Sequence, residues 1–329
     1  MKTYDFLSIG DTVTDAFIRL KDASVHCKLN KEDCELCMTF GDKIPYENVT
    51  VIPAVGNSAN AAVSAARLGL KSALVTNLGA DMYGKDALKY LKSQKVGTEF
   101  IKVNKKLKTN YHYVLWFEDD RTILVKHEKY PYSLPKLGKQ KWIYLSSLGA
   151  DANAMYPQLK AYLEANQDVK LVFQPGTYQM SGNVLEISYF YKRSEIFFCN
   201  KEESQRILKS EDHDIKNLLK NMRSLGPKMI VITDGPKGSY VYDGETYWQM
   251  PIYPDPKPPF ERTGAGDAFS STFTSVIALG RSIEEALMWA SINSMSVVQK
   301  VGAQAGLLTR KELEEYLKNA PADYKPRKI

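Results

Sequence analysis

The 329-residue sequence lacks long apolar runs. No stretch of about 18 apolar residues occurs, so no membrane-spanning helix is expected. The first five residues lead directly into a strand pattern and lack the apolar stretch of a secretory signal. We therefore expect a cytoplasmic protein that has no membrane partner.

A strong charge of one sign is also missing. The net charge is only +6, and the basic residues are scattered apart from a small cluster at 105–108 and a tail at 325–328. Nucleic-acid-binding surfaces are typically dense basic stripes with interleaved aromatic side chains. The sequence therefore predicts no nucleic-acid partner.

Cysteine is scarce, with four residues in the chain. His26, Cys27, Cys34 and Cys37 lie close together and are a conceivable zinc set. The single Cys-x-x-Cys has no second copy, which favours reduced thiols instead, and metal binding at these residues stays open. Cys199 lies in an expected strand and is assigned to the core.

Repeats and low-complexity tracts are absent, and the composition of 44% apolar and 25% charged residues is typical of a globular protein. Short apolar runs alternate with helical patterns, which indicates an α/β fold with a mainly parallel sheet covered on both faces. Expected strands cover 6–9, 73–75, 142–145, 171–173, 196–199, 229–233 and 239–242. Expected helices cover 59–68, 85–94, 153–166, 214–225, 267–279, 283–298 and 310–319. No Gly-x-Gly-x-x-Gly follows the first strand, which argues against a dinucleotide-dependent oxidoreductase.

The most informative stretch is Gly264-Ala265-Gly266-Asp267, which precedes an apolar helix. Glycines at a helix entrance let backbone N–H groups converge on one point, where the helix dipole also favours an anion such as phosphate. An aspartate in the same turn can take a proton from an attacking hydroxyl group. Such a phosphate cradle beside a carboxylate is what a kinase requires.

Six further motifs accompany this stretch in a characteristic order, and together they resemble the ribokinase-like, or phosphofructokinase-B, family of carbohydrate and nucleoside kinases. They are Phe6-Leu7-Ser8-Ile9-Gly10-Asp11 leading to Asp15, Val55-Gly56-Asn57-Ser58-Ala59-Asn60, Leu78-Gly79-Ala80-Asp81-Met82-Tyr83-Gly84, Asn200-Lys201-Glu202-Glu203, Thr233-Asp234-Gly235-Pro236-Lys237-Gly238 and Gly302-Ala303-Gln304.

The resemblance covers most of the chain and implies a ribokinase-like three-layer α/β/α core with a small β-sheet lid. It implies that residues 1–329 form a single kinase domain into which two lid segments, about 17–52 and 110–125, are inserted. The second segment reads as a β-hairpin with a polar turn. The lid would exclude water from the substrate, and its aromatic side chains could also form a homodimer face.

The resemblance also assigns roles to single residues. Asp267 would be the catalytic base, with Gly264, Ala265 and Gly266 as the anion hole. The acceptor would be bound by Asp15, which is expected in a loop after the first strand, and by Gly56, Asn57 and Asn60. ATP would be bound by Asn200, Glu203, Thr233, Gly235 and Gly238. Glu203 would in addition hold Mg²⁺ through water.

Simpler structural readings compete with several of these roles. Asp11 is the rival of Asp15, although it could simply cap the following turn. Asn60 and Asn200 could merely cap helices, and 233–238 could be an ordinary turn. Glu261 replaces an aspartate that many family members use at a monovalent-cation site, so K⁺ activation stays open.

The acceptor is not specified by the sequence. Leu145-Ser146-Ser147-Leu148 lacks the glutamate with which ribokinases often grip the sugar, and Gln174-Pro175 departs from the more usual Asp/Asn-Pro. Tyr111, Tyr113 and Trp116 could stack a nucleobase, whereas Arg121 or Lys43 could meet a substrate phosphate. The sequence predicts an ATP-dependent sugar kinase, with a nucleoside kinase or a non-catalytic ligand-binding relative as alternatives.

Overall fold

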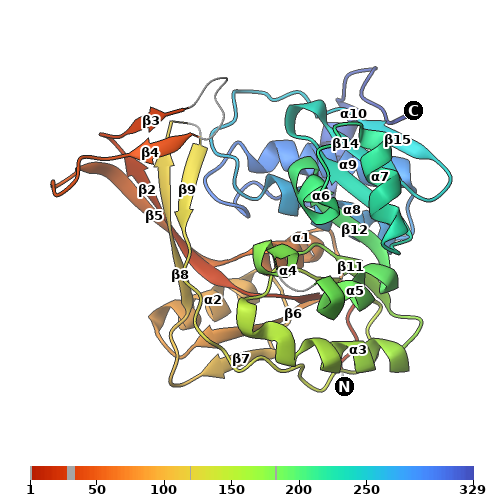
Figure 1. Ribbon diagram of the computed structural model, residues 1–329, viewed down its shortest axis with the longest axis horizontal. Coiled ribbons are helices and arrows are strands. Elements are labelled where there is room, and N and C mark those ends of the chain that lie inside the picture. The colour runs from red at the N-terminus through yellow and green to blue at the C-terminus, as the bar shows by residue number, and fades with distance from the viewer. Residues whose placement is uncertain (1, 28–33, 119, 182–183) are drawn as a thin grey trace.

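A ten-stranded sheet forms the centre of the computed structural model, which describes residues 2–27, 34–118, 120–181 and 184–329 (Figure 1). Seven neighbouring strands are parallel, in the order β13 (Met229–Thr233), β12 (Ser194–Asn200), β11 (Lys170–Phe173), β10 (Trp142–Leu145), β1 (Phe6–Ile9), β6 (Ser72–Gly79) and β7 (Ile101–Asn104). Three antiparallel strands extend the β13 edge, namely β14 (Ser239–Tyr242), β15 (Tyr247–Met250) and β16 (Arg327–Lys328).

Helices cover both faces of this sheet, which confirms the expected three-layer α/β/α architecture. One face packs against α3 (Tyr156–Ala165), α5 (Val184–Arg193) and α7 (Ile215–Ser224), with the short helices α4 (Thr177–Ser181) and α6 (Lys201–Leu208) nearby. The other face packs against α1 (Asn57–Arg67), α2 (Met82–Ser93), α8 (Ala265–Ala278), α9 (Ile283–Val297) and α10 (Arg310–Lys318). All the expected strands and helices are present, whereas β7, β15, β16 and α4–α6 were not expected.

The strand sequences explain why both faces are covered. In β1, Leu7 and Ile9 join one core cluster while Phe6 joins the cluster on the opposite face, and each is fully buried. Side chains alternate between the faces of a strand, so a strand that is buried throughout, as β1 is, needs a helix layer on either side. Within the described ranges, no helix has the length and apolar content needed to cross a membrane.

A smaller four-stranded sheet projects from this body in the order β5 (Tyr46–Val55), β2 (Val13–Leu20), β8 (Asn110–Phe117) and β9 (Asp120–Leu124) (Figure 1). The strands β8 and β9 form the expected hairpin. One expectation was wrong: Asp15 does not lie in a loop after the first strand but inside β2, where it pairs with His112 of β8. The sequence did not indicate β2 as a strand, because five of its eight residues are buried in succession and apolar and polar side chains do not alternate along it.

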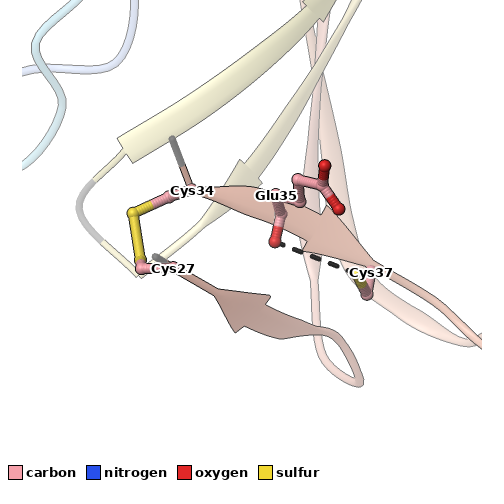
Figure 2. Close-up of a disulfide and its surroundings, with 4 residues drawn as sticks. All are labelled: Cys27, Cys34, Glu35 and Cys37. Carbon is pink, nitrogen blue, oxygen red and sulfur yellow. Dashed lines mark hydrogen bonds between the residues drawn. A yellow bond between two sulfur atoms is a disulfide. The ribbon is translucent and has the colours of Figure 1, made fainter. Parts of the chain in front are cut away.

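The expected reduced state of Cys27 and Cys34 was also wrong, whereas Cys37 is a free thiol as expected. The two-stranded hairpin of β3 (Ser24–His26) and β4 (Glu35–Cys37) pairs His26 with Glu35, so Cys27 and Cys34 become the next facing pair. Their Cα atoms are 4.0 Å apart and their sulfur atoms form a disulfide (Figure 2). Cys37 and Cys199 are free thiols, the latter buried as expected. The described residues contain no cluster of His, Cys, Asp and Glu that could hold a metal ion.

Candidate functional site

The N-terminus of α8 has no side-chain cap. Three other helices, α6, α9 and α10, begin with capping boxes in which side chains satisfy the first backbone N–H groups. By contrast, α8 begins at Gly264 in the left-handed conformation, with φ of 82° and no side-chain hydrogen bond. Free N–H groups and the positive end of the helix dipole therefore meet here, which makes the turn suitable for an anion.

Asp267 lies in this first turn and is held by two amide side chains. Its Oδ2 accepts a hydrogen bond from Asn60 Nδ2 at 2.8 Å, and its Oδ1 accepts one from Gln174 Nε2 at 3.2 Å. Gln304 Nε2 in turn donates to Asn60 Oδ1 at 2.8 Å. Asn60 is thus not a helix cap, since its amide connects Asp267 to Gln304.

Burial raises the pKa of Asp267, and the hydrogen bonds from Asn60 and Gln174 oppose this shift without cancelling it. A carboxylate with a raised pKa binds a proton more readily than an exposed one. The position and the environment of Asp267 therefore suit a group that accepts a proton from a bound molecule.

Two adjoining cavities open at the start of α8. The smaller one, of about 210 Å³, is lined by Asn57, Glu203, Gly264 and Asp267, among others. The larger one, of about 600 Å³, is lined by Gly235, Gly238 and Ala265 and by the apolar side chains of Ile252, Tyr253, Met295 and Val298. Both cavities share Asn200, Thr233, Gly266 and Phe269, so they meet at the α8 turn.

Asn200 and Glu203 form a capping box at the start of α6. Asn200 Oδ1 accepts from Glu203 N at 2.7 Å, and Glu203 Oε2 accepts from Asn200 N at 2.8 Å. Helix capping is thus present, and both residues also line the smaller cavity. Burial, together with the nearby charge of Asp267, raises the pKa of Glu203 against the opposing hydrogen bond from Asn200.

Thr233, Gly235 and Gly238 lie where β13 turns into β14. Gly238 has φ of 91°, and a Cβ atom there would lie 2.1 Å from the carbonyl oxygen of Met250. Gly235 has no atom within 4 Å of the corresponding position. Gly238 is therefore required by the turn itself, whereas Gly235 leaves space along the larger cavity.

Asp15 lies in the seam between the two sheets. Its side chain is only 10% exposed, its Oδ1 has no hydrogen-bond partner, and His112 Nδ1 is 3.5 Å away. Burial and the charge of Glu261 raise the pKa of Asp15 to about 7. Its carboxylate therefore keeps unused hydrogen-bonding capacity.

The rival residue Asp11 is fully engaged. It accepts hydrogen bonds from Tyr132 Oη and Gly149 N, each at 2.8 Å, and its Oδ2 is 3.2 Å from His127 Nδ1. Asp11 therefore anchors two loops rather than capping the turn that follows it.

Gly56 precedes α1 with φ of 108°, and a Cβ atom there would lie 2.8 Å from the Asp11 carbonyl oxygen. Neither Gly56 nor Asp15 lines the two cavities, but Gly56 places the next residue, Asn57, in the smaller one.

Glu261 is fully buried and faces an arginine of the small sheet. Its Oε1 accepts from Thr263 N at 2.6 Å, its Oε2 accepts from Gly302 N at 3.3 Å, and Arg121 Nε lies 3.7 Å from Oε1. Both oxygens of the carboxylate thus face N–H donors, and a guanidinium group supplies the counter-charge. K⁺ activation stays a hypothesis.

Sequence reasoning missed the contributions of Gln174, Arg121 and Arg262 to the smaller cavity. Gln174 directly follows β11, and the carboxyl ends of parallel strands are where such sheets bind ligands, so its position was a usable signal. Arg121 was noted only as a contact for a substrate phosphate. Nothing in its local sequence indicates that it faces Glu261.

The two glycines of the α8 turn should respond differently to alanine. In Gly264→Ala the new Cβ would combine a left-handed φ with a contact of 2.2 Å to Ala303 Cβ, so we expect a loss of about 2–4 kcal/mol in unfolding free energy. The matched Gly266→Ala should retain or slightly gain stability, because its Cβ meets no atom within 4 Å. Urea unfolding of both variants tests this, and equal stabilities would contradict it.

Asp15→Asn should stabilise the protein in a pH-dependent manner. The folded-state pKa of about 7 exceeds the ordinary aspartate value of 3.8, so wild-type stability is lost as the pH rises between these values. The variant cannot titrate at this position and lacks this loss. Its free energy of unfolding should therefore exceed that of the wild type by up to about 4 kcal/mol above pH 7. Urea unfolding near pH 5 and pH 8, with the exposed Asp86→Asn as control, measures the difference. An advantage that does not grow with pH would contradict the explanation.

Known proteins share this architecture. The family model for the pfkB family of carbohydrate kinases matches residues 22–310. The chain is 26% identical to ribokinase from Bacillus subtilis over 88% of its own length and 98% of that protein. The nucleoside kinase structure from Methanocaldococcus jannaschii covers 97% of this chain and all of its own, with a TM-score of 0.78 at 18% identity.

The structure of Arabidopsis thaliana ribokinase complexed with ribose and ATP superposes with a TM-score of 0.77 at 21% identity, covering 96% of this chain and 99% of that one. The match to the family model spans well over half of the sequence, and the central sheet with its separate small sheet agrees with it. The chain belongs to the pfkB family of carbohydrate kinases.

Proposed function

We propose that this kinase transfers the γ-phosphoryl group of ATP to a hydroxyl group of a sugar. The observation that carries the proposal is the placement of Asp267 in the uncapped first turn of α8, at the junction of the two cavities. This arrangement puts a proton acceptor and an anion site within one helical turn.

The smaller cavity suits the reacting groups. A hydroxyl group of the acceptor beside Asp267 would give its proton to the carboxylate as its oxygen bonds to the γ-phosphorus, while the bond to the β-phosphate oxygen breaks. The N–H groups of Gly264, Ala265 and Gly266 would stabilise the charge on the transferring group. Asn60 and Gln174 hold the carboxylate in position for this transfer.

The larger cavity suits the nucleotide. Its volume of about 600 Å³ is in the range of ligand sites, and its side chains of Ile252, Tyr253 and Met295 offer an apolar surface for a base. Asn200, Thr233, Gly235 and Gly238 would line the ribose and phosphates.

Glu203 would hold Mg²⁺ through water, and the ion would neutralise phosphate charge. A buried carboxylate whose pKa is raised beside Asp267 fits a nearby cation, which would offset the repulsion between the two acids.

Asp15, Gly56, Asn57 and Asn60 would bind the acceptor, and the small sheet, with the segments 17–52 and 110–125, would act as a lid over it. The free hydrogen-bonding capacity of Asp15 suits adjacent hydroxyl groups of a sugar.

The aromatic side chains of the small sheet favour a sugar over a nucleoside. The ring of Trp116 is covered by Arg19 at 4.2 Å and packs against Phe260 at 5.0 Å, while Tyr111 contacts Tyr83 and Tyr113. These rings therefore already have aromatic or guanidinium neighbours.

Asp267→Asn should lower kcat by at least about 100-fold, because an amide cannot accept the proton. The raised pKa predicts that the wild-type rate falls toward acid pH as Asp267 becomes protonated, and the variant should lack this limb. Measurement of ADP release with a panel of sugars and nucleosides gives both the kcat values and their pH dependence, with Asp86→Asn as a matched control. Retained activity in Asp267→Asn would contradict the role of Asp267, whereas ATP binding without turnover in the wild type would favour a non-catalytic relative.

We also propose a homodimer through the outer face of the small sheet. Val51, Tyr113 and Leu124 occupy one row across its strands, and each is about half exposed, at 47%, 49% and 51%. A row of exposed apolar side chains is typical of an interaction surface.

Tyr113→Glu should shift the mass measured by light scattering from dimer to monomer, because the interface would bury an unpaired charge. Val103→Glu on β7, which is exposed outside this face, serves as the control. A wild-type monomer at micromolar concentration would overturn the dimer.

A further inference from the structure

Arg121 reaches from the small sheet into the cavity that contains Asp267. It lies in β9 opposite Trp116 of β8, and it lines the cavity of about 210 Å³ together with Gly264, Gly266 and Asp267. Its side chain is 28% exposed. An arginine from a separate sheet thus adjoins the anion site of α8.

Glu261, on the core side, orients this arginine. The carboxylate is rigidly held by Thr263 N and Gly302 N, and its Oε1 lies 3.7 Å from Arg121 Nε. That nitrogen is buried without a hydrogen-bond partner. Asp120 Oδ1 lies 3.2 Å from Arg121 Nη1. The side chain is therefore directed by acidic groups, yet its donors are incompletely satisfied.

The small sheet is seated on the core at this point. Trp116 packs edge-on against Phe260, the neighbour of Glu261. Gly302 lies so close to Ile52 of β5 that a Cβ atom would be 2.3 Å from Ile52 Cδ1. These contacts place β9, and hence Arg121, relative to the α8 turn.

The cavity also needs positive charge. Asp267 and Glu203 line it, and a phosphoryl group would add further negative charge where burial already raises the pKa of both carboxyl groups. The basic side chains that line the cavity are Arg121 and Arg262. Arginine presents several donors in a fixed fork and stays protonated, which suits it to phosphate oxygens.

On the basis of the kinase function proposed above, we propose that Arg121 is a catalytic residue that the small sheet delivers to the phosphoryl-transfer site. Its guanidinium group contacts oxygens of the phosphoryl group in transit and stays protonated throughout, so no proton or bond is exchanged with it. Glu261 is its positioning residue. Since Arg121 supplies the counter-charge of Glu261, the reaction requires no K⁺.

The decisive experiment compares steady-state kinetics of the wild type, Arg121→Ala, Arg121→Lys and Lys126→Ala. Lys126 is the matched control because it follows β9, is 74% exposed and does not line the cavity. We expect Arg121→Ala to lower kcat about 100–1,000-fold with nearly unchanged KM values, because the contact forms in the transition state. The kcat of Arg121→Lys should lie between those of the wild type and Arg121→Ala, and the kcat of Lys126→Ala should stay within about twofold of the wild type.

Added guanidinium ion, at tens of millimolar, should partly restore Arg121→Ala but not Asp267→Asn. Kinetics in potassium and in choline buffers should agree for the wild type. Thermal unfolding confirms that each variant is folded, and if Arg121→Ala is not, Arg121→Lys decides by its loss of kcat.

Glu261→Gln tests the positioning role. It should lower kcat less than Arg121→Ala does, and the double variant should lose no more than Arg121→Ala alone, since both changes act through one guanidinium group. Additive losses would overturn this coupling.

An active wild type with an equally active Arg121→Ala would overturn the proposal, as would a loss confined to the KM of a phosphorylated acceptor or a wild type that requires K⁺. A wild type without any turnover would instead contradict the proposed function itself.

Discussion

The uncapped first turn of α8 is the constraint on which the candidate site depends. The helices α6, α9 and α10 satisfy their first N–H groups with side chains, whereas α8 enters through Gly264, whose left-handed φ and contact with Ala303 exclude a larger residue. Leaving N–H groups without a side-chain partner costs stability unless another group satisfies them. At α8 this cost falls where strand ends, two cavities and Asp267 converge.

Buried carboxylates carry a second cost at the same place. Burial raises the pKa values of Asp15, Glu203 and Asp267, so each disfavours folding in its charged form. Asp11 shows the alternative, because Tyr132 and Gly149 donate to its carboxylate. A chain selected for stability alone would satisfy Asp15 in the same way. Its unpaired oxygen is more simply explained by a ligand that supplies the missing donors.

The sequence predicted the layers, and it singled out many of the residues that line the two cavities, because both depend on local signals. Strands such as β1 are short apolar runs, and Gly264 to Asp267 is a helix entrance that can be recognised without knowledge of the rest of the fold. The pairing of Cys27 with Cys34 depends on the register of a three-residue hairpin, and Asp15 in β2 depends on pairing with β8. Arg121 and Glu261 are 140 positions apart in the sequence, and their contact depends on how the small sheet packs against the core. No local pattern encodes such contacts, since they arise only from packing.

In the proposed function, the small sheet would connect recognition of the acceptor with the chemistry of transfer. Asp15 lies on β2, His112 on β8 and Arg121 on β9, which are three neighbouring strands of one hydrogen-bonded sheet. Because the strands are bonded to one another, a movement of the sheet carries all three side chains together. An acceptor that satisfies Asp15 would favour the seated position of the sheet, and in that position Arg121 faces Glu261 beside the α8 turn. Binding energy from the acceptor would thereby help to assemble the charge that the transferring phosphoryl group requires. A single water molecule beside Asp267 would not favour the seated position of the sheet as the acceptor does. This difference gives a physical reason why a kinase would place an arginine on the small sheet rather than on the core.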